Sequence, residues 1–278
     1  MDNIYSLDSY YRELDEIARS GARVESIGKS TLGREIYAVH KGQGDGAEVL
    51  VHATIHAREY LTTPLVLHLM REYEGDTPIV CLPCVNIDGM ALVLEGLSSL
   101  DSEARREYII RANGGSTDMR YWKANANAVD LNVNFNANWG RGKSNIRHPN
   151  SANYIGEYPL SEVENRILAG ITLRLQPRIT LSYHTKGNVI YEGYESRKPY
   201  HAIAEHIANF INYDLMESKG SYGGYKDWFV ATTPYLGLTI ECGSDELSYP
   251  LPLNALEEMK RRQSGLLAEV ARLCQYIH

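Results

Sequence analysis

The sequence lacks several features that mark common protein classes. Its net charge is −7, from 28 Lys and Arg against 35 Asp and Glu, so it has no excess of basic residues for binding nucleic acid. No apolar run approaches the roughly 20 residues of a membrane-spanning helix. Residues 1–21 contain no basic stretch followed by an apolar one, so we expect no secretory signal. These absences predict no nucleic-acid partner, no membrane partner and a cytoplasmic location.

Cysteine is also scarce, and the motif of a nucleophilic serine hydrolase, Gly-x-Ser-x-Gly, is missing. Two of the four cysteines, Cys81 and Cys84, have the spacing of a redox or zinc pair. However, they lie in PIVCLPCVNIDG, which is typical of a buried strand. Positions three apart on a strand point to opposite faces, so we predict two small buried residues that share no metal. A reduced, cytoplasmic protein is the simplest interpretation.

The chain shows no internal repeat, low-complexity tract or linker, and 44% of its residues are hydrophobic, so we predict a single domain over residues 1–278. Strand-like runs occur at 22–28, 35–41, 47–55, 78–85, 178–184, 188–192 and 235–241. Helical patterns occur at 7–20, 63–73, 101–112, 161–175, 198–212 and 254–277. This alternation predicts an α/β fold with a mixed, largely parallel sheet covered on both faces.

Three of the predicted strands end in residues that could perform metal-assisted chemistry. The run EVLVHATIHAREYLTTP leads into His56 and Glu59, PRITLSYHTKGN into His184, and YLGLTIECGSDE into Glu241. His-x-x-Glu alone occurs about once by chance in such a chain. A hydrogen-bonded histidine and a structural salt bridge are the alternatives for the other two, although an unpaired buried carboxylate is costly. Catalytic zinc needs three ligands and a nearby base, so together the strand ends indicate hydrolysis of an amide.

Eight segments carry a resemblance to a known family. From IGKSTLGREIYAV through IHARE, VNIDG, VDLNVNF, YIGEYPLSEVE, LSYHT, GGYKDW and LTIEC, the sequence resembles the zinc carboxypeptidase (funnelin) family over nearly its whole length. The resemblance implies a sheet of about eight strands and one catalytic Zn²⁺ held by His56, Glu59 and His184. It makes Glu241 the base that activates water and later protonates the leaving amine. It also makes Arg58 a substrate-binding residue.

Two departures from the family pattern concern the binding of charged substrate groups. Asn132 matches the asparagine that holds the terminal carboxylate of a substrate, but Val133 stands where digestive relatives have an arginine that clamps it. An apolar side chain cannot replace a bidentate guanidinium–carboxylate pair. Lys123, which follows Trp122, takes the place of the arginine that stabilises the oxyanion, and it keeps the positive charge.

Further departures fall around the specificity pocket that the resemblance implies. Lys226 corresponds to the base of this pocket and would favour a negatively charged side chain, and Lys186 supplies a second cation. Either lysine could instead be solvated surface. Tyr222 is the nearest candidate for the mobile tyrosine of the family, because Lys219 occupies the expected position.

Among the family, bacterial γ-D-glutamyl-meso-diaminopimelate peptidases are most similar to WKANANAVDLNVNF and YGGYKDWF. Diaminopimelate carries a second carboxylate, which Lys226 or Lys186 could hold. We therefore predict a zinc metallopeptidase that cleaves the γ-D-Glu–meso-diaminopimelate bond of small murein peptides. The alternatives are a metallocarboxypeptidase that removes acidic C-terminal residues, and a non-catalytic peptide-binding protein. The sequence does not indicate an oligomeric state.

Overall fold

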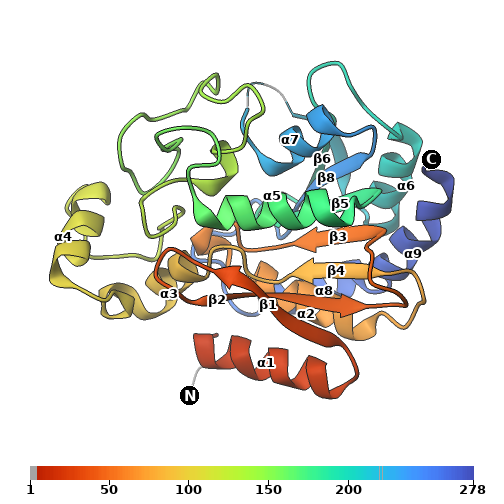
Figure 1. The fold of residues 1–278 in the computed structure, drawn as a ribbon, viewed down its shortest axis with the longest axis horizontal. Coiled ribbons are helices and arrows are strands. Elements are labelled where there is room, and N and C mark those ends of the chain that lie inside the picture. The colour runs from red at the N-terminus through yellow and green to blue at the C-terminus, as the bar shows by residue number, and fades with distance from the viewer. Residues whose placement is uncertain (1–4, 219, 221) are drawn as a thin grey trace.

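The computed structural model describes residues 5–218, 220 and 222–278. Its strands form one eight-stranded sheet in the order β1-β2-β4-β3-β5-β8-β6-β7 (Figure 1). The strands are β1 (Arg23–Lys29), β2 (Glu35–Lys41), β3 (Val49–His52), β4 (Ile79–Leu82), β5 (Ile179–His184), β6 (Val189–Glu192), β7 (Asp214–Glu217) and β8 (Leu236–Glu241). The helices are α1 (Leu7–Arg19), α2 (Thr62–Glu72), α3 (Ile87–Glu95), α4 (Glu103–Ala112), α5 (Val163–Leu175), α6 (His201–Ile211), α7 (Tyr225–Thr232), α8 (Ala255–Gln263) and α9 (Leu266–Leu273). Short 3₁₀ turns are η1 (Ala57–Glu59), η2 (Gly96–Ser99), η3 (Leu131–Val133) and η4 (Cys274–Tyr276).

The centre of the sheet is parallel. β3 pairs in parallel with β4 and β5, β5 pairs in parallel with β8, and β6 with β7. The pairs β1–β2, β2–β4 and β6–β8 are antiparallel. The predicted mixed, largely parallel sheet of about eight strands flanked by helices is therefore confirmed. β7, α3 and α7 lie outside the predicted elements, and the helix predicted at 254–277 is two helices, because the chain turns at Gly265 with a φ of +76°.

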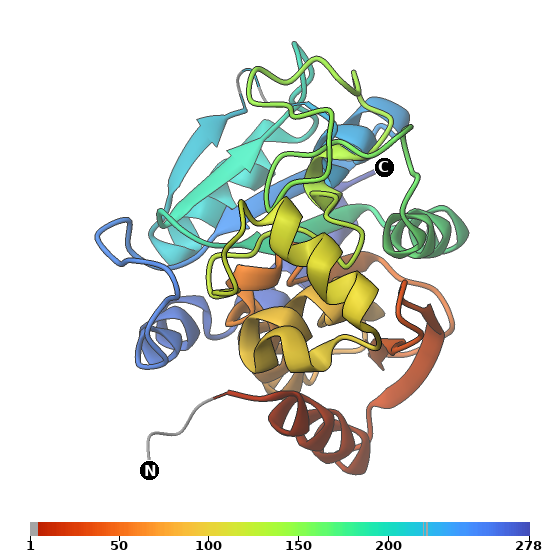
Figure 2. The same ribbon diagram turned by 90° about the vertical axis from the view of Figure 1, so that its left-hand side faces the viewer.

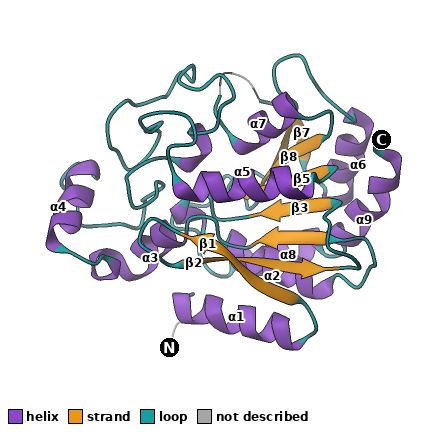
Figure 3. Cartoon of the chain, in the orientation of Figure 1, coloured by secondary structure: helices purple, strands orange, loops and turns teal. Residues whose placement is uncertain are grey.

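Helices cover both faces of the sheet (Figures 1, 2 and 3). On one face, α1, α2, α6, α8 and α9 pack with the sheet into one buried hydrophobic cluster. On the other, α5, α7 and the segment 131–137 form a second cluster. β5 contributes to both layers. Leu181 and Tyr183 belong to the first cluster, so Ser182 and His184, which alternate with them along the strand, point to the opposite face.

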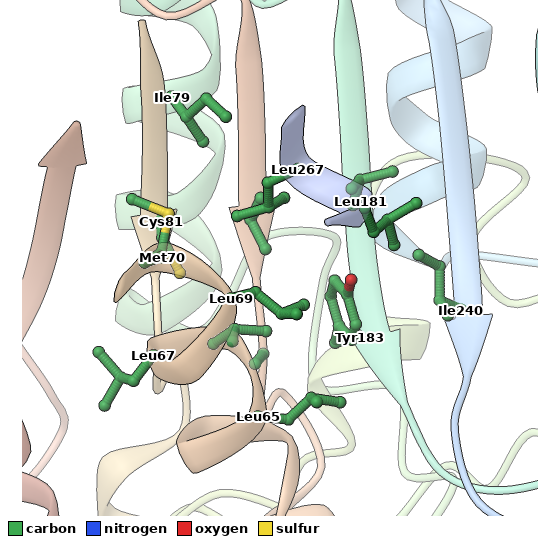
Figure 4. Close-up of a cluster of buried hydrophobic side chains, with 14 of the residues drawn as sticks. Leu65, Leu67, Leu69, Met70, Ile79, Cys81, Leu181, Tyr183, Ile240 and Leu267 are labelled. Carbon is green, nitrogen blue, oxygen red and sulfur yellow. The ribbon is translucent and has the colours of Figure 1, made fainter. Parts of the chain in front are cut away.

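The first cluster includes α2, which contacts β5, and Figure 4 shows its side chains together with those of β4, β5 and β8. Leu65 and Leu69 of α2 are buried there with Leu181 and Ile240. Leu181 has no exposed surface, and truncating such a leucine to alanine typically costs about 2–5 kcal/mol. This packing fixes the strands whose ends carry the predicted site.

All four cysteines are free and buried, as expected for residues that share no disulfide. Cys81 and Cys84 nevertheless join the same cluster rather than opposite faces of a strand. The reason is that β4 ends at Leu82, so strand alternation does not extend to Cys84. Within the described residues, no helix is long and apolar enough to cross a membrane.

Candidate active site

Three adjacent parallel strands bring the predicted site together. β3, β5 and β8 are neighbours in the sheet and run in the same direction, so their carboxyl ends meet at one edge. His184 is the last residue of β5, Glu241 is the last residue of β8, and the two are direct partners in the strand register. His56 and Glu59 come from the turn that follows β3.

The turn after β3 is held by buried hydrogen bonds. The Thr62 hydroxyl oxygen accepts a hydrogen bond from the Thr54 N–H at 3.0 Å, and the hydroxyl donates to the Glu59 carbonyl at 2.8 Å. The Asn86 amide donates to the carbonyls of Ile55, at 3.2 Å, and Ala124, at 3.1 Å. Because side chains satisfy this irregular backbone, His56 and Glu59 are presented on a rigid turn rather than on a loose loop.

Three donor atoms converge at the end of these strands. His56 Nδ1 lies 3.0 Å from one carboxylate oxygen of Glu59, and His184 Nδ1 lies 3.0 Å from the other. The two ring nitrogens are 3.1 Å apart. All three side chains are buried, and their donor atoms lie within 4.8 Å of one another. Two imidazole nitrogens and a carboxylate oxygen are the donor set of one class of catalytic zinc site.

The outer nitrogen of His56 faces a buried carboxylate that the sequence analysis missed. Asp130 Oδ1 lies 3.2 Å from His56 Nε2, and Asp130 Oδ2 lies 2.8 Å from Lys123 Nζ. A carboxylate at Nε2 assigns the ring proton to that atom and leaves the Nδ1 lone pair for a metal. The three convergent donors and this support fit one zinc ion. The only signal for Asp130 in the sequence was its place in VDLNVNF.

Charge around Asp130 is tightly balanced. Burial would raise the pKa of this carboxyl group, but Lys123 and His56 outweigh burial and hold it well below its usual range. Its oxygens also accept hydrogen bonds from the backbone N–H groups of Asn132 and Asn153, each at 3.1 Å. Lys123 is therefore anchored at the metal side of the site by a group that remains ionised.

Glu241 is the neighbouring carboxylate with the opposite behaviour. Burial raises its pKa to about 7, and Glu59 adds to this shift, while His184 and Lys123 oppose it. A bound divalent cation would also favour the ionised form. A carboxyl group that titrates near neutral pH can both accept and return a proton, which is the property needed for general acid–base catalysis.

A cavity of about 230 Å³ opens beside Glu241. Its lining residues are Asn132, Tyr191, Ser218, Gly224, Lys226, Asp227, Thr239 and Glu241. Asn132 Oδ1 accepts the Tyr225 N–H at 3.1 Å, which leaves the amide NH₂ of Asn132 available as a donor. The backbone at Gly223 packs closely against that of Val133. Only glycine fits there, since a Cβ at position 223 would lie 2.7 Å from the Val133 carbonyl oxygen. Val133 itself is not among the lining residues.

The predicted pocket lysines have different environments. Lys226 lines the cavity but is paired, because its Nζ lies 2.6 Å from Asp227 Oδ1 and donates to the Gly193 carbonyl. Lys186 instead donates to the Asp245 carbonyl and lies 3.4 Å from the Asp245 carboxylate. It does not line the cavity, so the second cation expected near the pocket holds the loop after β8.

Two further predicted residues, Arg58 and Tyr222, do not line the cavity. Arg58 stacks on Tyr249, with its guanidinium carbon 4.4 Å from the ring centroid, and the Tyr249 hydroxyl donates to the Thr185 carbonyl. No motif pointed to Tyr249. Tyr222 contacts Tyr194 edge-on, at 6.3 Å between ring centroids. Lys219 lies outside the described residues.

A family model described as zinc carboxypeptidase matches residues 7–263. The chain belongs to the zinc carboxypeptidase family. The resemblance predicted from the motifs is thus confirmed, and the three convergent donors agree with a family that is defined by zinc.

Individual relatives differ in how closely they match this family member. Gamma-D-glutamyl-L-diamino acid endopeptidase 1 of Lysinibacillus sphaericus is 31% identical over 86% of this chain, which spans 65% of that relative's length. Carboxypeptidase A from Helicoverpa armigera has a TM-score of 0.74 at 21% identity, over 99% of this chain and 74% of that one. Murein-tripeptide amidase MpaA from Escherichia coli O157 has a TM-score of 0.59 at 24% identity, over 91% of each chain. These two structural similarities show the fold.

Proposed function

We propose that this protein is a zinc-dependent metallopeptidase that hydrolyses the γ-D-Glu–meso-diaminopimelate bond of murein peptides. The convergence of His56, Glu59 and His184 beside Glu241 is the observation that carries the reaction class. Zinc held by these three ligands would act as a Lewis acid and lower the pKa of its bound water to about 7. The four free cysteines fit a cytoplasmic location, which is part of the proposal.

The residues around the ligands have distinct roles in this proposal. Glu241 accepts a proton from the attacking water and returns it to the leaving amine, a task that suits its raised pKa. Asp130 fixes the ring of His56. Lys123, held 2.8 Å from Asp130, keeps a positive charge on the side where negative charge develops on the carbonyl oxygen.

The substrate proposal rests on how the site would hold the groups next to the scissile bond. A γ-linked glutamate keeps its free α-carboxylate close to that bond. We assign this carboxylate to Arg58, whose guanidinium carbon lies over the Tyr249 ring and whose buried Nε has no hydrogen-bond partner among the described residues. The relative from Lysinibacillus sphaericus is named for cleavage next to γ-D-glutamyl groups, which supports the same substrate class.

The leaving-group side also departs from a digestive carboxypeptidase. With valine at position 133, the amide of Asn132 offers a neutral donor in the cavity for the main chain of the leaving residue. A neutral amide group can donate to an amide carbonyl or to a carboxylate, so binding does not require a free carboxylate and the substrate can continue beyond diaminopimelate. The alternative, removal of acidic C-terminal residues, is less favoured, because Asp227 already neutralises Lys226 in the cavity lining.

Comparison of three substrates tests the proposal. L-Ala-γ-D-Glu-meso-diaminopimelate, a blocked dipeptide ending in Phe and one ending in Glu are assayed with the zinc-loaded protein. The first should have the highest kcat/KM. Faster cleavage of the Phe dipeptide would refute the murein substrate, whereas preference for the Glu dipeptide would support the acidic carboxypeptidase instead.

A further inference from the structure

The lining of the cavity beside Glu241 contains an ion pair rather than a single charge. Lys226 and Asp227 are 4% and 3% exposed, and both line the cavity. Lys226 Nζ lies 2.6 Å from Asp227 Oδ1. An ammonium group has three N–H donors; one is used by the Gly193 carbonyl and one faces Asp227, which leaves a third. Asp227 Oδ1 is itself buried and faces this ammonium group.

This pair discriminates against ligands that carry one charge. A lone carboxylate that approaches Lys226 also meets the carboxylate of Asp227, and a lone ammonium that approaches Asp227 also meets Lys226. Because both side chains are buried, repulsion between like charges at this pair is only weakly screened by solvent. A ligand that carries both charges on adjacent atoms satisfies both residues, because each of its charges meets an opposite one.

We propose that Lys226 and Asp227 together bind the free α-amino-acid end of the diaminopimelate side chain, with its carboxylate on Lys226 and its ammonium on Asp227. The inference rests on the proposed function and names the feature of the substrate that is selected. Glu241 lines the same cavity, so the far end of a side chain reaches the pair while the scissile amide lies beside the base. The pair thereby selects diaminopimelate over lysine, which has the same chain without the second carboxylate.

A series of four peptides tests the selection. Each is L-Ala-γ-D-Glu-X, where X is meso-diaminopimelate, L-lysine (ammonium only), L-α-aminopimelate (carboxylate only) or L-norleucine (neither). With the wild-type protein, kcat/KM for the diaminopimelate peptide should exceed that for the lysine and aminopimelate peptides by roughly ten- to a hundredfold each, as for a lost hydrogen bond to a charged group. Cleavage of the norleucine peptide within threefold of the first would overturn the proposal.

Single variants assign the two charges. Lys226→Met should reduce cleavage of the diaminopimelate peptide to the level of the lysine peptide, because residue 226 no longer binds the side-chain carboxylate of diaminopimelate. Asp227→Asn should reduce it to the level of the aminopimelate peptide. The double variant Lys226→Met/Asp227→Leu removes the whole buried pair and leaves no unpaired charge, so it guards against misfolding of the single variants. If the single variants lose activity equally on all four peptides, the charge assignment is wrong.

Binding separates this inference from the proposed function. Glu241→Gln, loaded with zinc, is titrated calorimetrically with the same four peptides. Preferential binding of the diaminopimelate peptide, together with no cleavage by wild type, would refute the proposed function and support the ion-pair site. Cleavage of all four peptides at similar rates would support the hydrolase and refute the ion-pair site.

Discussion

Replacing Asp130 by asparagine should weaken the metal site without altering any metal ligand. Asp130 is fully buried and is shared between His56 Nε2, at 3.2 Å, and Lys123 Nζ, at 2.8 Å. Asparagine offers one acceptor and one donor group in place of two acceptor oxygens. Its NH₂ group would therefore face either the N–H of His56 or the ammonium of Lys123, and one of these donors would lose its partner.

These contacts set the expected losses in zinc affinity and in folding free energy. Loss of a carboxylate that orients a metal-binding histidine typically lowers metal affinity by about 10–100-fold, or roughly 1.4–2.7 kcal/mol. Removing one partner of a buried charge pair costs about 3–5 kcal/mol of folding free energy. We therefore expect the Asp130→Asn protein to bind zinc about 10–100-fold more weakly and to unfold at a markedly lower denaturant concentration.

Competition with a chromophoric chelator measures zinc affinity, and urea denaturation of the metal-free protein measures stability. Asp118→Asn is a matched control, because Asp118 pairs with Arg120 at the exposed surface, and it should change neither value detectably. Zinc affinity equal to that of the wild type in Asp130→Asn would refute the role given to this carboxylate.

Other changes test the base, the carboxylate site, a buried titrating group and the core. Glu241→Gln should keep its zinc content while kcat falls by about 10²–10⁴-fold, the usual contribution of a general base; unchanged turnover would exclude Glu241 as the base. Val133→Arg should raise kcat/KM for a peptide ending in free diaminopimelate about tenfold relative to one extended by D-Ala, and an unchanged ratio would contradict the account of this position. Burial raises the pKa of Glu164, so the stability that its protonated form contributes is complete below the unfolded value of about 4.3 and is lost as pH rises through the raised pKa; Glu164→Gln should remove this dependence from pH-resolved unfolding curves. Leu181→Ala should cost about 2–5 kcal/mol in urea denaturation, and a loss below 1 kcal/mol would show that the site layer does not depend on this packing.

The sequence was sufficient to predict the elements whose residues alternate or repeat strongly. β2 lies at the predicted residues 35–41, and β5 and β8 begin one residue inside the predicted runs. β7 escaped prediction because it is an exposed edge strand without an apolar face. α7 follows two glycines and is rich in aromatic residues, a composition that favours strand over helix.

In the site, too, some residues could be predicted from the sequence and others could not. Residues at the ends of apolar strands could be found from the sequence, because topology brings parallel strand ends together. Asp130 and Tyr249 could not, since their importance comes from partners distant in the chain: His56 for Asp130, and Arg58 for Tyr249. The charge of Lys226 was visible in the sequence, but its neutralisation by the adjacent Asp227 depends on side-chain direction, which a sequence does not give.

The pairing of His184 with Glu241 in the strand register separates the chemistry from the choice of substrate. Because the two are opposite each other on neighbouring strands, the spacing between the proposed metal ligand and the proposed base is set by the backbone ladder of the sheet. Val133 and Lys226 lie outside that ladder, in η3 and α7. The peptides that the protein accepts can therefore change through substitutions in these outer segments while the hydrolytic geometry stays constant. Redesign of specificity should begin there, with the strands left untouched.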